Sequence, residues 1–92
     1  MIFCVEDDAG IRDLIIYTLN AYGFQAEGFQ DAAAFWPALS KRKPDLILLD
    51  IMLPGEDGIS ILKRLKNQSS TEDIPVIMTT CLLYTSPSPR DS

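Results

Sequence analysis

Two short apolar runs, each ending in acidic residues, set the strongest limit on what this 92-residue chain can fold into. The first run is Ile2 to Val5, which stops at Glu6-Asp7-Asp8, and the second is Leu46 to Leu49, which stops at Asp50. Strands of a parallel sheet are buried on both faces and therefore read as continuous apolar runs. If the two strands are neighbours in the sheet, their acidic tips converge at the edge where both strands end.

Between these runs the pattern changes to helix and then to a weaker strand. Helical spacing predicts a helix over Ile11 to Tyr22, with Asp8 as its N-cap and Gly23 closing it in a left-handed conformation. The apolar positions of that helix are Ile11, Leu14, Ile15, Leu19 and Tyr22. Residues 24–29 alternate weakly, which predicts a short strand near a sheet edge.

The rest of the chain repeats the alternation of helix and strand. Asp31 is the expected N-cap of a helix through residues 32–36, in which Pro37 predicts either a kink or a late start. Residues 74–80 form a fourth apolar run. The helix before it carries an expected apolar face made of Ile59, Leu62 and Leu65. This β-α-β-α-β-α-β order, with right-handed crossovers, predicts an α/β fold with helices on both faces of a parallel sheet.

Composition excludes several kinds of chemistry. The chain has no histidine and only two cysteines, Cys4 and Cys81, so it cannot build a Cys/His zinc site, a Ser-His-Asp triad or a haem axial pair. Its formal charge of −5, with scattered basic residues, predicts contact with neither nucleic acid nor membrane. Cys4 is interpreted as a small core residue. With no membrane-spanning run or signal peptide, we expect a cytoplasmic chain.

The acidic tips themselves indicate a cation site. Glu6, Asp7 and Asp50 would repel one another at close range, so they must either hold a proton or share a cation. An all-oxygen site open to water suits Mg²⁺. The alternative is that Asp7, Asp8 and Asp50 only cap helices and turns, but two acidic tips on two buried strands favour the cation site.

An aspartate beside Mg²⁺ can act as a nucleophile on a phosphoryl group, because the cation neutralises both the attacking oxygen and the transferred group. Thr80, at the end of the fourth strand, is placed to hold a phosphoryl oxygen. The alternative for Thr80 is that it is only a strand-forming residue.

Three segments together resemble a known family. They are Val5-Glu6-Asp7-Asp8 with Ile11-Arg12, Pro44 to Gly55 with Asp57-Gly58, and Ile74 to Thr80. The combination is similar to the receiver domain of bacterial two-component response regulators. The resemblance implies a flavodoxin-like, three-layer, doubly wound sheet with strand order 2-1-3-4-5, and this sequence ends before the fifth strand.

The same resemblance implies a role for each matching residue. Asp50 would be the phosphoacceptor, and Glu6 and Asp7 would hold Mg²⁺ together with Asp50 and the backbone carbonyl of Met52. Thr80 would be the switch hydroxyl, and Asp8 would lie outside the metal's ligands. The expected partner is a histidine kinase or phosphotransfer protein. The family's lysine and aromatic switch residue, on or near the fifth strand, have no counterpart here.

Three functions remain to be compared. The first is a phosphorylated signalling switch rather than an enzyme, and the Met52 to Gly58 loop resembles that of DNA-binding regulators. The second is an aspartyl-phosphate phosphatase of the haloacid-dehalogenase type, which would need an aspartate where Met52 stands. The third is a pseudo-receiver that acts by protein contacts without phosphorylation, although such proteins tend to lose the acidic residues retained here.

The C-terminal segment has a different origin in our interpretation. Cys81 to Asp91 resembles the in-frame translation of a transposase-type sequencing adapter, and the two prolines and three serines of residues 81–92 oppose regular structure. We therefore expect a partial receiver domain over residues 1–80 and a non-native, disordered tail over residues 81–92. Without the rest of its sheet, such a fragment is expected to be marginally stable.

Overall fold

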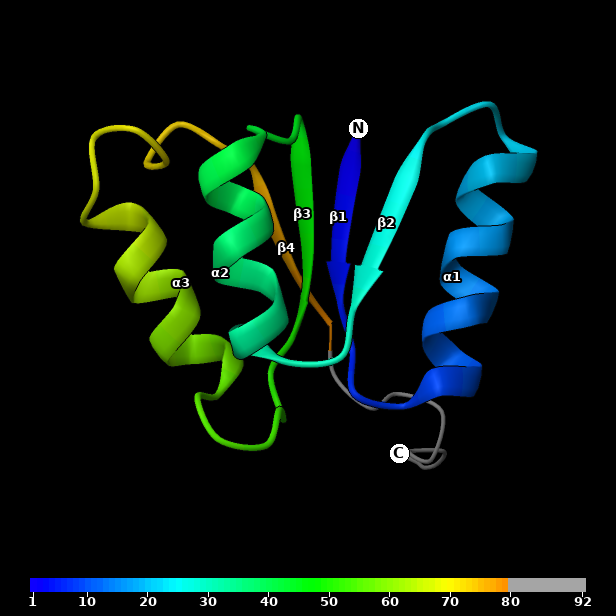
Figure 1. The fold of residues 1–92 in the computed structure, drawn as a ribbon, viewed down its shortest axis with the longest axis horizontal. Helices are drawn as coiled ribbons and strands as arrows, with labels where there is room; N and C mark the ends of the chain where they lie inside the picture. Colours follow the sequence, from blue (N-terminus) through cyan, green and yellow to red (C-terminus); the bar gives the residue numbers. More distant parts are fainter. Residues whose placement is uncertain (80–92) are drawn as a thin grey trace, which may run out of the picture.

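The structure, a computed structural model, describes residues 1–79, in which four strands alternate with three helices (Figure 1). All strand pairs are parallel, and the sheet order is β2-β1-β3-β4. In chain order the elements are β1 (Ile2–Val5), α1 (Ala9–Ala21), β2 (Ala26–Phe29), α2 (Ala32–Lys41), β3 (Leu46–Asp50), α3 (Gly58–Lys66) and β4 (Val76–Thr79). This arrangement confirms the predicted flavodoxin-like α/β class and the order of its first four strands.

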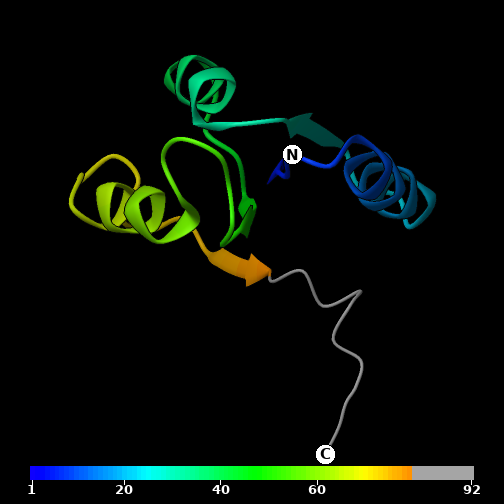
Figure 2. The ribbon, with the colours of Figure 1, turned by 90° about the horizontal axis from the view of Figure 1, so that it is seen from below.

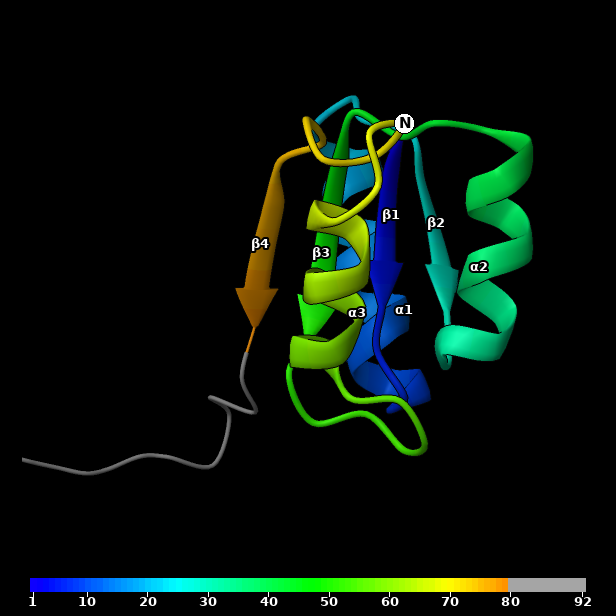
Figure 3. The ribbon, with the colours of Figure 1, turned by 90° about the vertical axis from the view of Figure 1, so that its left-hand side faces the viewer.

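The helices lie on both faces of the sheet. Figure 2 shows α1 on one face and α2 with α3 on the other, and Figure 3 shows β4 and β2 at opposite edges. The main core fills the space between the sheet and the α2–α3 layer, and no residue of α1 is fully buried. Within the described residues, no helix is long and apolar enough to cross a membrane.

Aromatic rings form the centre of this core. Phe3, Phe29 and Phe35 contact one another edge to face, with ring centroids 5.0 to 6.3 Å apart. Edge-to-face packing is favourable because the positive edge of one ring meets the negative face of another. Cys4 is buried on the same central strand as Phe3, and burial raises the pKa of its thiol to about 11. This confirms Cys4 as a core residue.

An aspartate caps each of the three helices. The side chains of Asp8, Asp31 and Asp57 accept hydrogen bonds of 2.8 to 2.9 Å from the backbone N–H three residues further on. Each bond satisfies a donor that the first helical turn would otherwise leave free. At the far end of α1, Gly23 takes the left-handed φ of 91° that was predicted for the closing residue. Asp8 and Asp31 are therefore confirmed as caps.

Two predictions about apolar helix faces were wrong in part. In α3, Ile59 is 42% exposed, and the buried residues are Gly58, Ile61 and Leu65. Leu14 in α1 and Tyr22 at its C-cap are exposed, although both have helical spacing. Apolar residues stood on two adjacent stripes of each helix, and periodicity alone does not determine which stripe faces the sheet.

The possible late start of the second helix was also wrong. Helix α2 begins at Ala32 and continues through Pro37 to Lys41. Its first turn is stabilised by the Asp31 cap and by burial of Ala32 and Phe35, which together outweigh the backbone hydrogen bond that Pro37 cannot donate.

We expect Phe35→Ala to lower the free energy of unfolding by about 3 to 5 kcal/mol, because it removes a fully buried ring from the aromatic core. Urea denaturation followed by circular dichroism measures the change. Tyr17→Ala, on the exposed side of α1, is the matched control and should change stability by no more than about 0.5 kcal/mol. Equal losses in the two variants would contradict this account of the core.

Candidate metal and phosphoacceptor site

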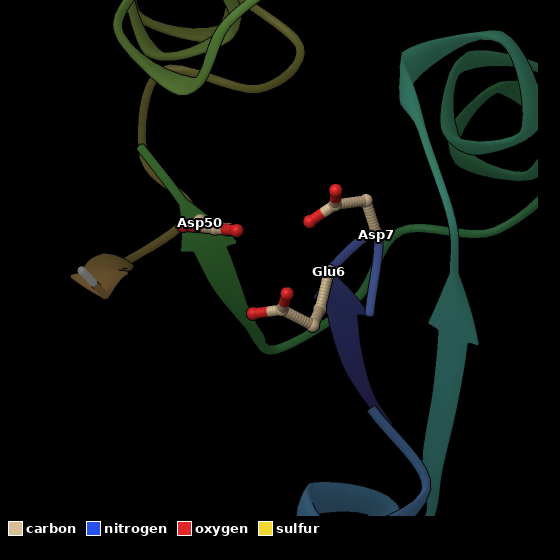
Figure 4. A group of neighbouring side chains, drawn as sticks. All are labelled: Glu6, Asp7 and Asp50. Carbon is tan, nitrogen blue, oxygen red and sulfur yellow. The ribbon is translucent and has the colours of Figure 1, made fainter. Parts of the chain in front are cut away.

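Three acidic side chains meet where β1 and β3 end (Figure 4). The two strands pair with Val5 opposite Leu49, so Glu6, which follows β1, and Asp50, the last residue of β3, lie at the same level of the sheet. Asp7 follows directly, and one carboxylate oxygen from each of the three residues lies within 4.8 Å of the others. The structure therefore brings together the three carboxylates that the strand pattern predicted to converge.

The carboxylates differ in exposure and in hydrogen bonding. Asp50 is 1% exposed, and its Oδ1 accepts a 3.2 Å hydrogen bond from the backbone N–H of Met52. Its Oδ2 is buried with no hydrogen-bond partner among the described residues. Glu6 is 5% exposed and accepts from the Asp8 N–H at 3.1 Å, whereas Asp7 is exposed at the mouth of the site. A buried polar atom without a partner is costly, so this site favours a ligand that satisfies Asp50.

Burial, and to a smaller extent neighbouring negative charge, changes the protonation of the site. Burial raises the pKa of Glu6 from 4.5 to about 7, and the charge of Asp50 adds to this effect, while the hydrogen bond from Asp8 opposes it. A proton on Glu6 relieves the repulsion when no cation is present. A divalent cation would relieve it more fully, because it pairs with several carboxylates at once.

The loop after Asp50 folds back onto that residue. Gly55 takes a left-handed φ of 76°, and the N–H of Gly58 donates to the Ile51 carbonyl at 3.0 Å. A Cβ on Gly58 would lie 2.2 Å from the carbonyl oxygen of Asp50, so only glycine permits this approach. The loop therefore holds Met52 beside Asp50. The role of the Met52 carbonyl as a metal ligand stays a prediction.

The end of β4 lies on the other side of Asp50. Thr79 is its register partner across the β3–β4 pair, and the Thr79 hydroxyl donates to the Leu49 carbonyl at 3.4 Å. Thr80, the predicted switch residue, lies outside the described residues, as do Cys81 and the predicted non-native tail. Their roles stay predictions.

Arg12 supports the backbone of the acidic segment that begins at Glu6. No structural role for this residue was predicted from the sequence. Its guanidinium Nη1 donates to the backbone carbonyl of Glu6 at 2.8 Å. The Arg12 side chain reaches this position over Gly28 of β2, where a Cβ would lie 2.9 Å from the arginine Cγ and Cδ. Two signals were present in the sequence: Arg12 belongs to the first segment that carries the family resemblance, and a glycine inside a strand often marks close approach of another group.

The residues present fit a hard divalent cation. All three side chains offer oxygen, which Mg²⁺ prefers, and two of them are buried while the third opens to water. The unpartnered Oδ2 of Asp50 is the atom that such an ion would satisfy. Thiol and imidazole groups do not contribute to the cluster, which argues against a softer metal.

Known proteins identify the class to which this fold and site belong. The family model described as "Response regulator receiver domain" matches residues 2–85, so this chain belongs to the response regulator receiver domain family. Among curated relatives, the phosphate regulon transcriptional regulatory protein PhoB of Escherichia coli strain K12 is 47% identical over 79 residues. The match covers 86% of this chain and 34% of PhoB, so the chain spans about a third of that relative's length.

Further relatives agree with this assignment. The DNA-binding dual master transcriptional regulator RpaA of Synechocystis is 37% identical, over 88% of this chain and 34% of RpaA. The N-terminal domain of a response regulator receiver protein from Methanoculleus marisnigri superposes with a TM-score of 0.80 at 36% identity, over 84% of this chain and 63% of that one. Chemotaxis protein CheY4 of Vibrio cholerae gives 0.79 at 26% identity, over 84% and 64%.

From the raised pKa of Glu6 we expect stability, and the affinity of the site for added Mg²⁺, to depend on pH. In the absence of Mg²⁺, the folded chain keeps this proton up to about pH 7, whereas the unfolded chain loses it near pH 4.5. The folded state therefore binds more protons in this window, so its free energy of unfolding should fall as the pH rises from about 4.5 to about 7. Mg²⁺ must displace the proton, so its affinity should fall as the pH drops below about 7.

Thermal unfolding in EDTA and calorimetric Mg²⁺ titration at several pH values test both trends, with Glu6→Gln as the variant that should flatten them. Acidic groups with lowered pKa values stabilise the fold in a different window, because they lose their charge only below their ordinary pKa. These groups are Asp45, Glu56, Asp57 and Asp73. A Mg²⁺ affinity that stays constant from about pH 5 to 8 would contradict the role of Glu6.

Proposed function

We propose that this receiver domain is a phosphoryl-accepting switch in which Asp50 is the phosphoacceptor and a histidine kinase or phosphotransfer protein is the donor. The observation that carries the proposal is the buried Asp50 carboxylate, which has one unpartnered oxygen and two further acidic groups beside it. A purely structural aspartate would have its oxygens satisfied by the fold. The 47% identity to PhoB supports the same role.

Glu6, Asp7, Asp50 and the Met52 carbonyl would hold the Mg²⁺ that the site fits. When bound, the ion supplies positive charge that offsets repulsion between the acidic cluster and an incoming phosphoryl group. The protein supplies position: the Met52 amide fixes one oxygen of Asp50, and Arg12 fixes the backbone of Glu6.

In the transfer step, bonds change only between the Asp50 carboxylate, the phosphoryl group and its donor. A carboxylate oxygen of Asp50 attacks the phosphorus of a phosphohistidine, forming an O–P bond as the P–N bond breaks. The electron pair of the broken bond stays on the imidazole nitrogen, which can then take up a proton. Attack of water on the phosphorus returns Asp50 to its carboxylate and releases inorganic phosphate. Thr80 would hold a phosphoryl oxygen in the phosphorylated state.

The output of the switch is proposed from the relatives. PhoB and RpaA are named as transcriptional regulators, and RpaA as DNA-binding, so we propose that this domain belongs to a DNA-binding transcriptional regulator. The present segment, with a formal charge of −5, is not expected to contact DNA itself.

Acetyl phosphate and Mg²⁺ should add one phosphoryl group to the folded chain, and Asp50→Asn should abolish the addition because the amide is not nucleophilic. Intact mass spectrometry measures the product, after circular dichroism has shown cooperative unfolding of each chain. Asp13→Asn, an exposed aspartate in α1, is the matched control and should be modified like the wild type. A folded chain that binds Mg²⁺ but takes up no phosphoryl group would contradict the proposal and favour the pseudo-receiver.

A further inference from the structure

A second group of interacting side chains lies on the far part of the loop that follows Asp50. It consists of Trp36 from α2, Glu56 from the loop and Arg64 from α3, and we refer to it as the Trp36–Glu56–Arg64 cluster. The indole Nε1 of Trp36 donates to Glu56 Oε1 at 3.0 Å. The Nη1 of Arg64 donates to both oxygens of the same carboxylate, at 2.7 and 3.0 Å.

A third contact, between Arg64 and Trp36, completes the cluster. The guanidinium carbon of Arg64 lies 4.2 Å from the centroid of the Trp36 ring, which is a cation–π contact. The Glu56 side chain is 23% exposed, the most covered carboxylate among the ion pairs of residues 1–79. Exposed ion pairs contribute little because water screens them. The Arg64 side chain is half-exposed, so the restraint on the loop comes from the three mutual contacts around the mostly covered Glu56 carboxylate and not from the ion pair alone.

The cluster acts on the middle of a loop whose two ends already touch Asp50. At the start of the loop, the Met52 N–H donates to Asp50 Oδ1, and at its end Gly58 approaches the Asp50 carbonyl. Between these points the chain turns through Gly55, and Glu56 fastens it to α2 and α3. With three points of attachment, the backbone around Met52 has little freedom to move away from the acidic cluster.

We infer that Glu56 is a positioning residue for the cation site, which it supports by holding the loop that presents the Met52 backbone to Asp50. The inference rests on the proposed function, since it concerns the same Mg²⁺ site. Ordering the loop before the ion arrives removes an entropic cost from binding. Groups that orient metal ligands from outside typically change metal affinity by about 10- to 100-fold when they are removed.

The test compares Glu56→Gln with Glu27→Gln in the 92-residue chain. The control breaks a similar ion pair, between Glu27 and Arg42, that does not involve the loop. Calorimetric titration with Mg²⁺ alone gives the affinity, and thermal unfolding in EDTA gives the stability. We expect Glu56→Gln to weaken Mg²⁺ binding about tenfold, while Glu27→Gln binds within about twofold of the wild type, even if both lower stability equally.

Two further measurements make the result specific to the loop. Hydrogen exchange of the Met52 and Gly58 amides without Mg²⁺ should be faster in Glu56→Gln than in the wild type or the control, because both amides depend on the loop's closure. Trp36 is the only tryptophan, so its fluorescence reports directly on the cluster. If Glu56→Gln does not unfold cooperatively, Arg64→Met removes both hydrogen bonds to Glu56 while keeping an apolar side chain, and the same effects are expected.

The outcomes separate the two proposals. Wild-type Mg²⁺ affinity in a Glu56 or Arg64 variant whose cluster is shown to be broken by Trp36 fluorescence would overturn the positioning role and leave the proposed function intact. Equal weakening in Glu27→Gln would overturn it as well, because the effect would then follow stability alone. A folded wild-type chain that binds no Mg²⁺ would overturn the proposed cation site, and the positioning role with it.

Discussion

The parallel pairing of β1 with β3 is the constraint on which the rest of the site depends. Its register places Val5 opposite Leu49, so Glu6 and Asp50 emerge side by side from the interior of the sheet. Neither residue can move away, because the strands that carry them are buried and hydrogen-bonded on both sides. The fold therefore brings like charges together as a direct consequence of sheet geometry, and the stability of the surrounding core must outweigh their repulsion.

The same repulsion favours a positively charged ligand at this site. The raised pKa of Glu6 and the unpartnered oxygen of Asp50 show that the fold alone leaves these acids unsatisfied. A ligand that supplies positive charge gains from relieving both conditions. Burial of Asp50 strengthens its interaction with such a ligand, because charges interact more strongly away from water, and for the same reason an unpaired charge there is costly. The repulsion that destabilises the acidic cluster is therefore also what would favour a cation bound to it.

Much of this arrangement could be predicted from sequence because it depends on one-dimensional patterns. Buried strands read as apolar runs, and an acid at the end of each run marks the strand's carboxyl end, which was sufficient to bring Glu6 near Asp50. Asp8 and Asp31 were recognisable as caps from their position before a helical pattern. In α3 the pattern was ambiguous between adjacent stripes, and Ile59 was assigned to the core although Ile61 occupies it.

Contacts made by side chains from several elements could not be predicted in this way. The reach of Arg12 over Gly28 depends on how α1 crosses β2, and the Trp36–Glu56–Arg64 cluster requires two helices and a loop to be in place first. The two clusters also differ in how their carboxylates are hydrogen-bonded. Glu56 receives three hydrogen bonds, whereas the buried Asp50 keeps one oxygen free among the described residues.

This difference separates the task of holding the loop from the task of binding a ligand. A carboxylate whose oxygens are satisfied by Arg64 and Trp36 gains little from a cation. Glu56 therefore links the loop to α2 and α3 and is not a ligand-binding group. Asp50 receives from the loop only the Met52 amide, and that single bond orients its carboxylate without satisfying it. The loop region thus supplies polar partners to both oxygens of Glu56 and, among the described residues, leaves one oxygen of Asp50 without a partner.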